Sequence, residues 1–307
     1  MTRVVKIYPF IEAEKQHSHA GRGSNVARAC ELLKVSRSAY YAHAGAAAAG
    51  GTRRRREDAD LLERVRHHHA GSKGRNGAPR IHTDLAAEGR LHGRKRVARL
   101  MREHGIVGKH RRRGRRTTIP DPAAPACTDL IGRDFTVDAN AVNSRWCGDI
   151  TYIRTWAGWL YLATVIDIAS RRVVGWATAD HLRTDLVETA LRHAVTRRRP
   201  PPGVIFHADR GCQYTSAQFA ATAADLDVRL SHGRKGQCWD NAVGESFFAT
   251  IKTELPEDGV WPTHASARTA IFEYIESDYN LRRRHSTLGY LSPATYEATA
   301  TTNQEVA

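Results

Sequence analysis

A nearly uninterrupted apolar run, GWLYLATVIDIAS at residues 158–170, constrains the fold of this 307-residue chain more than any other feature. Apolar residues at consecutive positions fit a strand that is buried on both faces, as in the centre of a sheet. The run is also shorter than the roughly 18 to 20 residues that a membrane-spanning helix needs. The sequence therefore predicts a globular protein with a central β-sheet and no membrane partner.

The segments around this run complete an α/β pattern. Further strands are expected at 146–153, 171–179, 204–209 and 227–231, and helices at 184–198, 216–226 and 240–255. Three antiparallel strands followed by helix, strand, helix, strand and helix is the order of the RNase H-like fold. We therefore predict an α/β RNase H-like core, with a mixed five-stranded sheet and flanking helices, preceded by an all-α helix-turn-helix region.

Positive charge is concentrated in the first 120 residues, which hold 28 Lys and Arg against 10 Asp and Glu, a net charge of +18. Residues 121–307 hold 19 against 22, a net charge of −3. The bias toward arginine favours binding to a polyanion over a merely solvated basic surface, because guanidinium groups contact phosphates bidentately. We expect the partner to be double-stranded DNA, bound by the first part of the chain.

Two segments in this basic part have the outline of a helix-turn-helix. Residues 22–43 have apolar spacing at Val26, Ala29, Leu32 and Leu33, and Ser36 is a possible cap of a second helix, although two ordinary packed helices would look the same. Residues 77–108 end in a basic helix. The DNA-binding candidates are Arg94, Lys95, Arg96, Arg99 and Arg102 on that helix, and Arg111, Arg112 and Arg113 on a following flexible arm.

Composition sets the expected domain boundaries. Residues 1–50 form an N-terminal helix-turn-helix-like segment, and AGAAAAGG at 44–51 has the composition of a linker. Residues 51–118 form a second, basic helix-turn-helix domain. The segment 119–139 contains a proline-rich linker, and 140–300 form the catalytic domain with a C-terminal helical extension.

Three acidic residues are expected to meet in the predicted fold. Asp149 lies within the first strand, Asp209 at the end of the fourth, and Glu245 one turn into the last helix. Each alone is more simply a cap or a surface charge, but together they suit a hard cation with oxygen ligands. Asp167, at the end of the second strand, could be a fourth ligand but is not among the predicted metal ligands, and Asp240 fits a helix N-cap better than a ligand. Lys252, two turns beyond Glu245, is a candidate contact to the DNA backbone, or simply an exposed lysine.

The five cysteines argue against two other kinds of site. They are widely spaced and contain no CxxC pair, so neither a disulfide framework nor a CxxC-based zinc site is expected. The first twenty residues lack the apolar core of a signal peptide. We expect a cytoplasmic protein.

Three motifs resemble successive signatures of bacterial insertion-sequence transposases, the DDE enzymes of the insertion-sequence 3 group. They are HADRGCQYTS (207–216), CWDNAVGESFFATIKTEL (238–255) and YNLRRRHSTLGYLSPATYE (279–297), and the similarity spans about residues 20–298. These enzymes share the integrase catalytic core with retroviral integrases. The resemblance implies that Asp149, Asp209 and Glu245 are the catalytic triad, and that they bind Mg²⁺ or Mn²⁺, as two ions in the active complex.

The resemblance also implies cleavage and transfer of DNA strands at the element's ends, by a homo-oligomer and without a covalent protein intermediate. It further implies that the chain is encoded by the downstream one of two overlapping reading frames. The upstream-frame product is then a possible partner, and the bacterial protein is nucleoid-associated when it binds DNA. Two alternatives stay open: a catalytically silent DNA-binding regulator, which the presence of all three acids disfavours, and an RNase H-superfamily nuclease that cleaves without joining.

Overall fold

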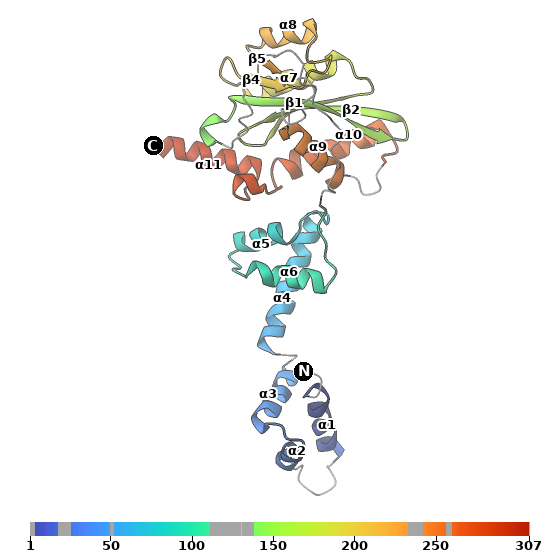
Figure 1. Ribbon diagram of the computed structural model, residues 1–307, viewed down its shortest axis with the longest axis vertical. Helices are drawn as coiled ribbons and strands as arrows, with labels where there is room; N and C mark the ends of the chain where they lie inside the picture. Colours follow the sequence, from blue (N-terminus) through green and yellow to red (C-terminus); the bar gives the residue numbers. More distant parts are fainter. Residues whose placement is uncertain are drawn as a thin grey trace, which may run out of the picture. The chain divides into compact units, whose positions relative to one another are not determined.

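The computed structural model describes residues 4–17, 26–49, 52–110, 130, 138–232, 242–255 and 260–306. The chain divides into two compact units, Met1–Gly108 and Lys109–Ala307 (Figure 1). Among the helices in the described ranges, none combines the length and the apolar character needed to cross a membrane.

The first unit begins with three short helices, α1 (Val4–His17), α2 (Val26–Leu32) and α3 (Arg37–Ala48). They enclose a small apolar cluster in which Ile11, Cys30 and Tyr40 are almost completely buried. The predicted cap is confirmed, because the backbone N–H of Ala39 donates to the Ser36 hydroxyl oxygen at 3.4 Å.

The sequence-based prediction is incomplete at the start of this helical group and wrong at its end. Helix α1 was not predicted, since Pro9 lies within it and interrupts the usual helical pattern. The linker predicted at 44–51 is wrong over most of its length, because α3 continues through Ala48. Alanine has the highest helix propensity of all residues, so a run of alanines prolongs a helix until glycines end it.

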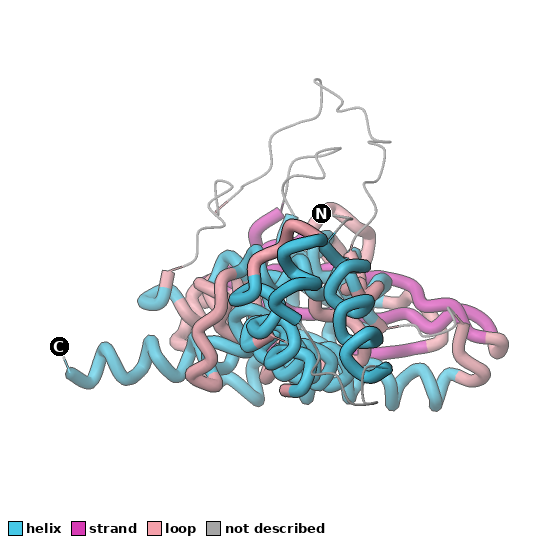
Figure 2. The backbone as a smooth tube through the Cα atoms, turned by 90° about the horizontal axis from the view of Figure 1, so that it is seen from below, coloured by secondary structure: helices cyan, strands magenta, loops and turns pink. Residues whose placement is uncertain are grey.

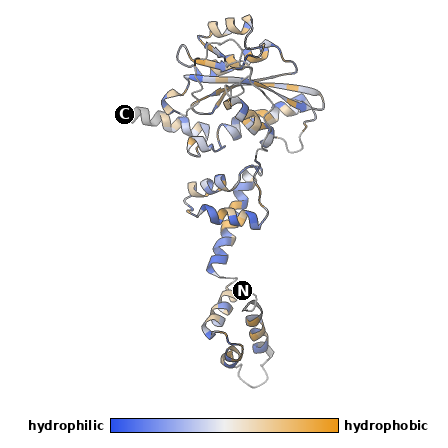
Figure 3. Cartoon of the chain, in the orientation of Figure 1, coloured by the Kyte–Doolittle hydropathy of each residue, from blue (hydrophilic) through white to orange (hydrophobic). Residues whose placement is uncertain are grey.

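The second group of helices consists of α4 (Arg53–Gly71), α5 (Ala78–Ala87) and α6 (Arg94–Glu103). Apolar residues of all three gather into one core, which appears as orange patches in Figure 3, whereas the first turns of α4 are strongly hydrophilic. The fully or almost fully buried members are Leu61, Val65, Ile81, Leu85, Val97, Leu100 and Met101. Helix α5, its turn and α6 form the helix-turn-helix expected at 77–108, and this turn contains Gly89 at a positive φ of 77°.

The second unit contains one mixed five-stranded sheet, drawn in magenta in Figure 2. Its strands are β1 (Arg145–Thr155), β2 (Gly158–Asp167), β3 (Val173–Ala179), β4 (Ile205–Ala208) and β5 (Arg229–His232). The spatial order is β3-β2-β1-β4-β5; the first three strands are antiparallel to their neighbours in sequence, and β4 and β5 run parallel to β1. The predicted sheet is confirmed, with the long apolar run forming β2.

Helices cover both faces of this sheet (Figure 1). Helices α7 (Thr184–Arg198) and α8 (Ala217–Asp225) pack on one face, and α9 (Ala242–Glu254) and α10 (His264–Phe272) on the other. Helix α7 comes unusually close to β3 at Gly175, where a Cβ atom would collide with the backbone oxygen of Ala190. Two separate apolar cores therefore hold the sheet between its helices, as the apolar run on β2 predicts.

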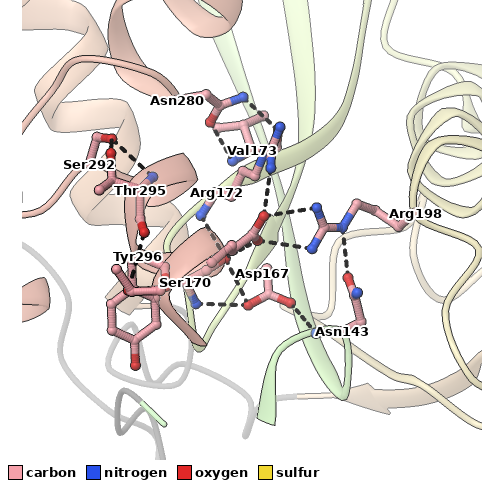
Figure 4. A network of polar contacts seen from close by, with 12 residues as sticks. Asn143, Asp167, Ser170, Arg172, Val173, Arg198, Asn280, Ser292, Thr295 and Tyr296 are labelled. Atoms are coloured by element: carbon pink, nitrogen blue, oxygen red, sulfur yellow. Dashed lines mark hydrogen bonds and ion pairs between the residues drawn. The ribbon is translucent and has the colours of Figure 1, made fainter. Parts of the chain in front are cut away.

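The C-terminal part returns to the sheet through a π-helical segment (Glu273–Tyr279), a 3₁₀ turn (Ser286–Leu288) and helix α11 (Pro293–Val306); another 3₁₀ turn (Ala139–Ala141) precedes β1. Figure 4 shows how polar contacts attach this part to the sheet. Glu297 of α11 accepts hydrogen bonds from Arg172 at 2.6 Å and from two guanidinium nitrogens of Arg198, each at 2.9 Å. The side-chain amide of Asn280 pairs with both backbone groups of Val173 at 3.0 Å.

Asp167 belongs to this network and not to the catalytic candidates. Its carboxylate accepts backbone N–H groups of Asn143 at 2.7 Å and of Ser170 at 2.8 Å (Figure 4). Burial raises its pKa, while these two hydrogen bonds lower it. The residue is fully buried, so its role is to fix the turn after β2 and the chain just before β1, and Ser170 links this turn to Glu297 of α11.

Candidate active site

Asp149 lies on β1 just beyond the residues that pair with β4. Strand β4 pairs with β1 only at residues 145–147, whereas β2 continues alongside and places Thr164 opposite Asp149. The Asp149 side chain is half-buried, and its Oδ1 accepts the backbone N–H of Ile150 at 2.8 Å. Its second carboxylate oxygen therefore remains for other partners.

Asp209 and Asp149 both lie just beyond the paired part of β1 and β4. Cys147 is the partner of His207 in this parallel pair, so each aspartate follows the last paired residue of its strand by two positions. Asp209 directly follows β4 and is exposed, and its Oδ1 accepts the N–H of Gly211 at 3.0 Å. Asp149 thus lies on β1, and Asp209 lies just past the carboxyl end of the neighbouring strand β4.

Glu245 approaches from the helix below these strands. It occupies the first turn of α9 and is exposed, while Val243, Phe247 and Ile251 of the same helix are buried against the sheet. An acid in the first turn is also favourably placed with respect to the helix dipole. Figure 1 shows α9 running beneath β1, the strand that carries Asp149, and the two elements are in contact.

The charges of Asp209 and Glu245 act on Asp149. The pKa of Asp149 is raised to about 7, chiefly by burial and further by the negative charges of Asp209 and Glu245; the Ile150 N–H and the positive charge of Lys252 oppose this rise. Among the described residues, no three His, Cys, Asp or Glu side chains stand close enough to enclose a metal ion. Two of the carboxylates therefore act on the charge of the third, but among the described residues they do not form a closed cage.

Carboxylate oxygens of this kind suit a divalent cation. Mg²⁺ prefers oxygen ligands and commonly takes only one or two carboxylates from the protein, completing its shell with water and substrate phosphates. A nearby cation would also oppose the burial and the repulsion that raise the pKa of Asp149. The donor set thus fits the group that the sequence analysis expected.

Lys252 lies on the same helix as Glu245 and beside the same aspartate. Its Nζ is 4.7 Å from the centre of the Tyr152 ring, a cation–π contact. Burial lowers the pKa of Lys252, and the charge of Asp149 partly offsets this effect. The lysine is thus held at the border of the carboxylate site, although its side chain is exposed.

The basic residues of α6 divide into two groups. Arg94, Lys95 and Arg102 are exposed. Arg96 and Arg99 are instead half-buried and bind Asp58 of α4, with N–O distances of 2.6 and 2.7 Å. The other three candidates, Arg111, Arg112 and Arg113, lie outside the described residues.

We expect the Arg94→Ala/Lys95→Ala double variant to weaken duplex binding and to reduce the slope of log K against log salt concentration by about 2, because two phosphate contacts no longer release counterions. Arg96→Ala or Arg99→Ala should instead lower the free energy of unfolding by about 1 to 2 kcal/mol, since Asp58 loses a charged partner. Salt titrations of binding and thermal unfolding measure the two effects. A stable Arg96→Ala protein that loses duplex binding would contradict this division.

A buried ion pair links the C-terminal signature to α9. The sequence analysis did not predict this pair. Arg283, from YNLRRRHS, contacts Glu254 with several N–O distances between 2.9 and 3.2 Å, and the Tyr274 hydroxyl donates to the same carboxylate at 2.9 Å. Both charged side chains are at least 86% buried, since they expose only 14% and 5% of their surface. In the sequence, the only sign of this ion pair is that both residues belong to the quoted motifs. That they contact each other follows only from the fold.

Comparisons with known proteins agree with this architecture. The family model "Integrase core domain" matches residues 139–238, a second integrase core model matches 226–293, and "HTH-like domain" matches 55–114. The transposase InsF for insertion sequence IS3A of Escherichia coli (strain K12) is 38% identical over 271 residues, covering 87% of this chain and 92% of that protein. The transposase for insertion sequence element IS904 of Lactococcus lactis is 39% identical over 239 residues, covering 78% and 92%.

Two solved structures are similar at lower levels. A simian T-cell lymphotropic virus intasome in complex with PP2A regulatory subunit B56 gamma has 16% identity and a TM-score of 0.44, covering 70% of each chain. The HTLV-2 integrase catalytic core domain in complex with magnesium has 15% identity and a TM-score of 0.38, covering 51% of this chain and 97% of that one. The identity to the IS3 relatives over most of both chains decides the family. The chain belongs to the IS3 family of DNA transposases, which are polynucleotidyl transferases with an integrase core and an HTH-like domain.

Proposed function

We propose that this transposase cleaves and joins DNA strands at the ends of an insertion sequence, with Asp149, Asp209 and Glu245 as its catalytic DDE triad. The main support for the proposal is that Asp149 is half-buried and that its pKa is raised, chiefly by burial and further by the negative charges of the other two acids. In the proposed site, the three carboxylates from β1, the end of β4 and α9 would face one region of the sheet.

The same three residues would hold Mg²⁺ or Mn²⁺, as two ions in the active complex. When bound, such ions polarise an attacking water or 3′-hydroxyl and stabilise the leaving oxygen during in-line displacement at phosphorus. Asp149 must be ionised to act as a ligand, so a cation and a proton compete for its carboxylate near neutral pH. Lys252 would contact the DNA backbone beside this site.

The remaining parts of the chain position the substrate. Exposed basic residues of α6, such as Arg94 and Lys95, would contact duplex phosphates, and Arg111–Arg113 would extend this contact. Acting on two element ends calls for more than one protomer, so we expect a homo-oligomer on DNA. The upstream-frame product is a further candidate partner.

The test uses the purified full-length protein and a duplex carrying the inverted repeats that flank its gene. With Mg²⁺ or Mn²⁺ we expect cut ends and joined products, and none after chelation with EDTA, because the metal-free carboxylates repel a phosphate. A duplex with scrambled ends is the control. No cleavage with either ion would contradict the proposal, and cleavage without joining would favour the nuclease alternative.

A further inference from the structure

Aromatic side chains are exposed on the β1–β2 hairpin, next to the carboxylate site. Tyr152 exposes 56% of its surface, Trp156 75% and Trp159 48%. Tyr152 and Trp159 contact each other edge to face, with their ring centres 5.0 Å apart. Large aromatic groups left in water on a folded domain are typical of a binding surface, because burying them would be strongly favourable.

Two of these rings line a hollow of about 240 Å³. Its other side is formed by the end of α9 and by Trp261, which is held beside the hairpin because its backbone oxygen accepts the N–H of Trp156 at 2.8 Å. Among the residues that the structure describes, the lining also includes two cations, Lys252 and Arg154, and no acid. The hollow is thus aromatic and positively charged, and it is large enough for one small planar group.

The position of the hollow ties it to the carboxylate site. Tyr152 is three residues from Asp149 on the same strand, a separation of about 10 Å at about 3.3 Å per residue. Lys252 connects the two places, since its Nζ lies over the Tyr152 ring and its charge acts on Asp149. A ligand in the hollow would therefore lie within a few nucleotides of a phosphate at the carboxylates.

The chemistry of the lining selects the ligand. A nucleobase presents a flat π-face to an aromatic ring, and its phosphate presents a negative charge to a lysine or arginine. Bases inside a duplex are already stacked on their neighbours, so only an unpaired base is free to enter. A second copy of this chain would bury the same rings, but it would also have to pair both cations.

We propose that this hollow binds one unpaired nucleobase of the DNA strand, stacked on Trp159 with its phosphate near Lys252. The identification of the ligand as DNA rests on the proposed function. It adds a site that holds a single strand open next to the reacting phosphate.

The test measures affinity for a short labelled oligothymidylate by fluorescence anisotropy, with the full-length protein, in EDTA and at high salt. High salt weakens phosphate-driven binding to the basic helices, and stacking then contributes a larger share. Trp159→Ala is expected to weaken binding by roughly 5- to 150-fold, the range for one stacked base. Trp159→Phe should restore most of the affinity, because a phenyl ring can still stack.

Two matched controls separate stacking from charge and from damage to the fold. Trp156→Ala removes the more exposed hairpin tryptophan, which does not line the hollow, and should bind like the unmodified protein. An abasic strand of the same length keeps the phosphates without the bases, so its affinity should not respond to Trp159→Ala. Thermal unfolding should be nearly unchanged, since Trp159 is already half exposed.

Three results would overturn the inference: equal oligothymidylate binding by Trp159→Ala, an equal loss for the abasic strand, or a change of oligomeric state without a change in oligothymidylate affinity. The last result would mean that a second protomer covers the rings. Because the assay contains no metal, it can succeed even if cleavage fails, and cleavage at duplex ends can succeed even if this site is absent.

Discussion

Asp149→Asn, Asp209→Asn and Glu245→Gln are each expected to lower the rate of strand cleavage and joining by about 10³-fold or more. The metal ions of such a site supply several kcal/mol of stabilisation to the transition state, and about 1.4 kcal/mol corresponds to a factor of ten. Binding of the duplex ends should change little, because the exposed basic residues of α6 belong to the other compact unit. Cleavage assays at saturating protein separate the two steps.

Glu273→Gln is the matched control for this series. Glu273 is an exposed acid at the start of the π-helical segment, outside the carboxylate site. Its replacement removes the same charge as Glu245→Gln and should leave cleavage within about twofold of the unmodified protein. Near-normal cleavage by any of the three triad variants would remove that residue from the catalytic assignment.

The same Asp149→Asn change should make the metal-free protein more stable above neutral pH. Asp149 has a folded-state pKa of about 7, whereas an unfolded aspartate titrates near 3.9, so the folded state binds this proton more tightly. Folding stability therefore falls as the pH rises from about 4 to 7, and the full cost is present above pH 7. The three-unit difference corresponds to at most about 4 kcal/mol.

Denaturant unfolding in EDTA tests this at several pH values. At pH 8 the Asp149→Asn protein should exceed the unmodified protein in unfolding free energy, and the difference should shrink toward zero near pH 4. Asp225→Asn, on an exposed residue at the end of α8, should show no such trend. A pH-independent difference would mean that repulsion and burial at Asp149 are not its cause. Added Mg²⁺ should stabilise only proteins that retain the carboxylates.

The sequence was sufficient to predict the sheet because its strands are distinct in composition. The run at 158–170 has no polar face, and the residues of β1 and β3 alternate or are rich in β-branched and aromatic types. For the same reason the sequence was sufficient to assign Asp149 to β1 and Asp209 to the end of β4, because both residues belong to segments with strand composition.

Other features depend on contacts that no local pattern reveals. Arg96 and Arg99 have the spacing of a basic outer face, but Asp58, about 40 residues earlier, draws both into ion pairs. Likewise, nothing in the sequence shows that Glu254 would bury its charge against Arg283 and Tyr274. Each pairing joins segments far apart in the chain, so only the folded arrangement determines which charges face solvent.

The hairpin aromatics illustrate a related limit. Tyr152 and Trp159 fit strand composition equally well as core or as surface residues, because alternation along a strand does not say which face is covered. Strand β4 is short and leaves the outer half of β1 unpaired on that side. Strand β3 likewise pairs with β2 only from Tyr161 onward, so the end of the hairpin that carries these rings extends beyond both neighbouring strands.

The most direct test of the central claim is a crystal structure of the full-length protein bound to its end DNA and Mn²⁺, with anomalous scattering to locate the metal. We predict manganese between the carboxylates of Asp149 and Asp209, with Glu245 turned toward the same position and a DNA phosphate completing the coordination. Manganese bound elsewhere on the protein, with these three side chains directed away from it and from the phosphate, would contradict the account.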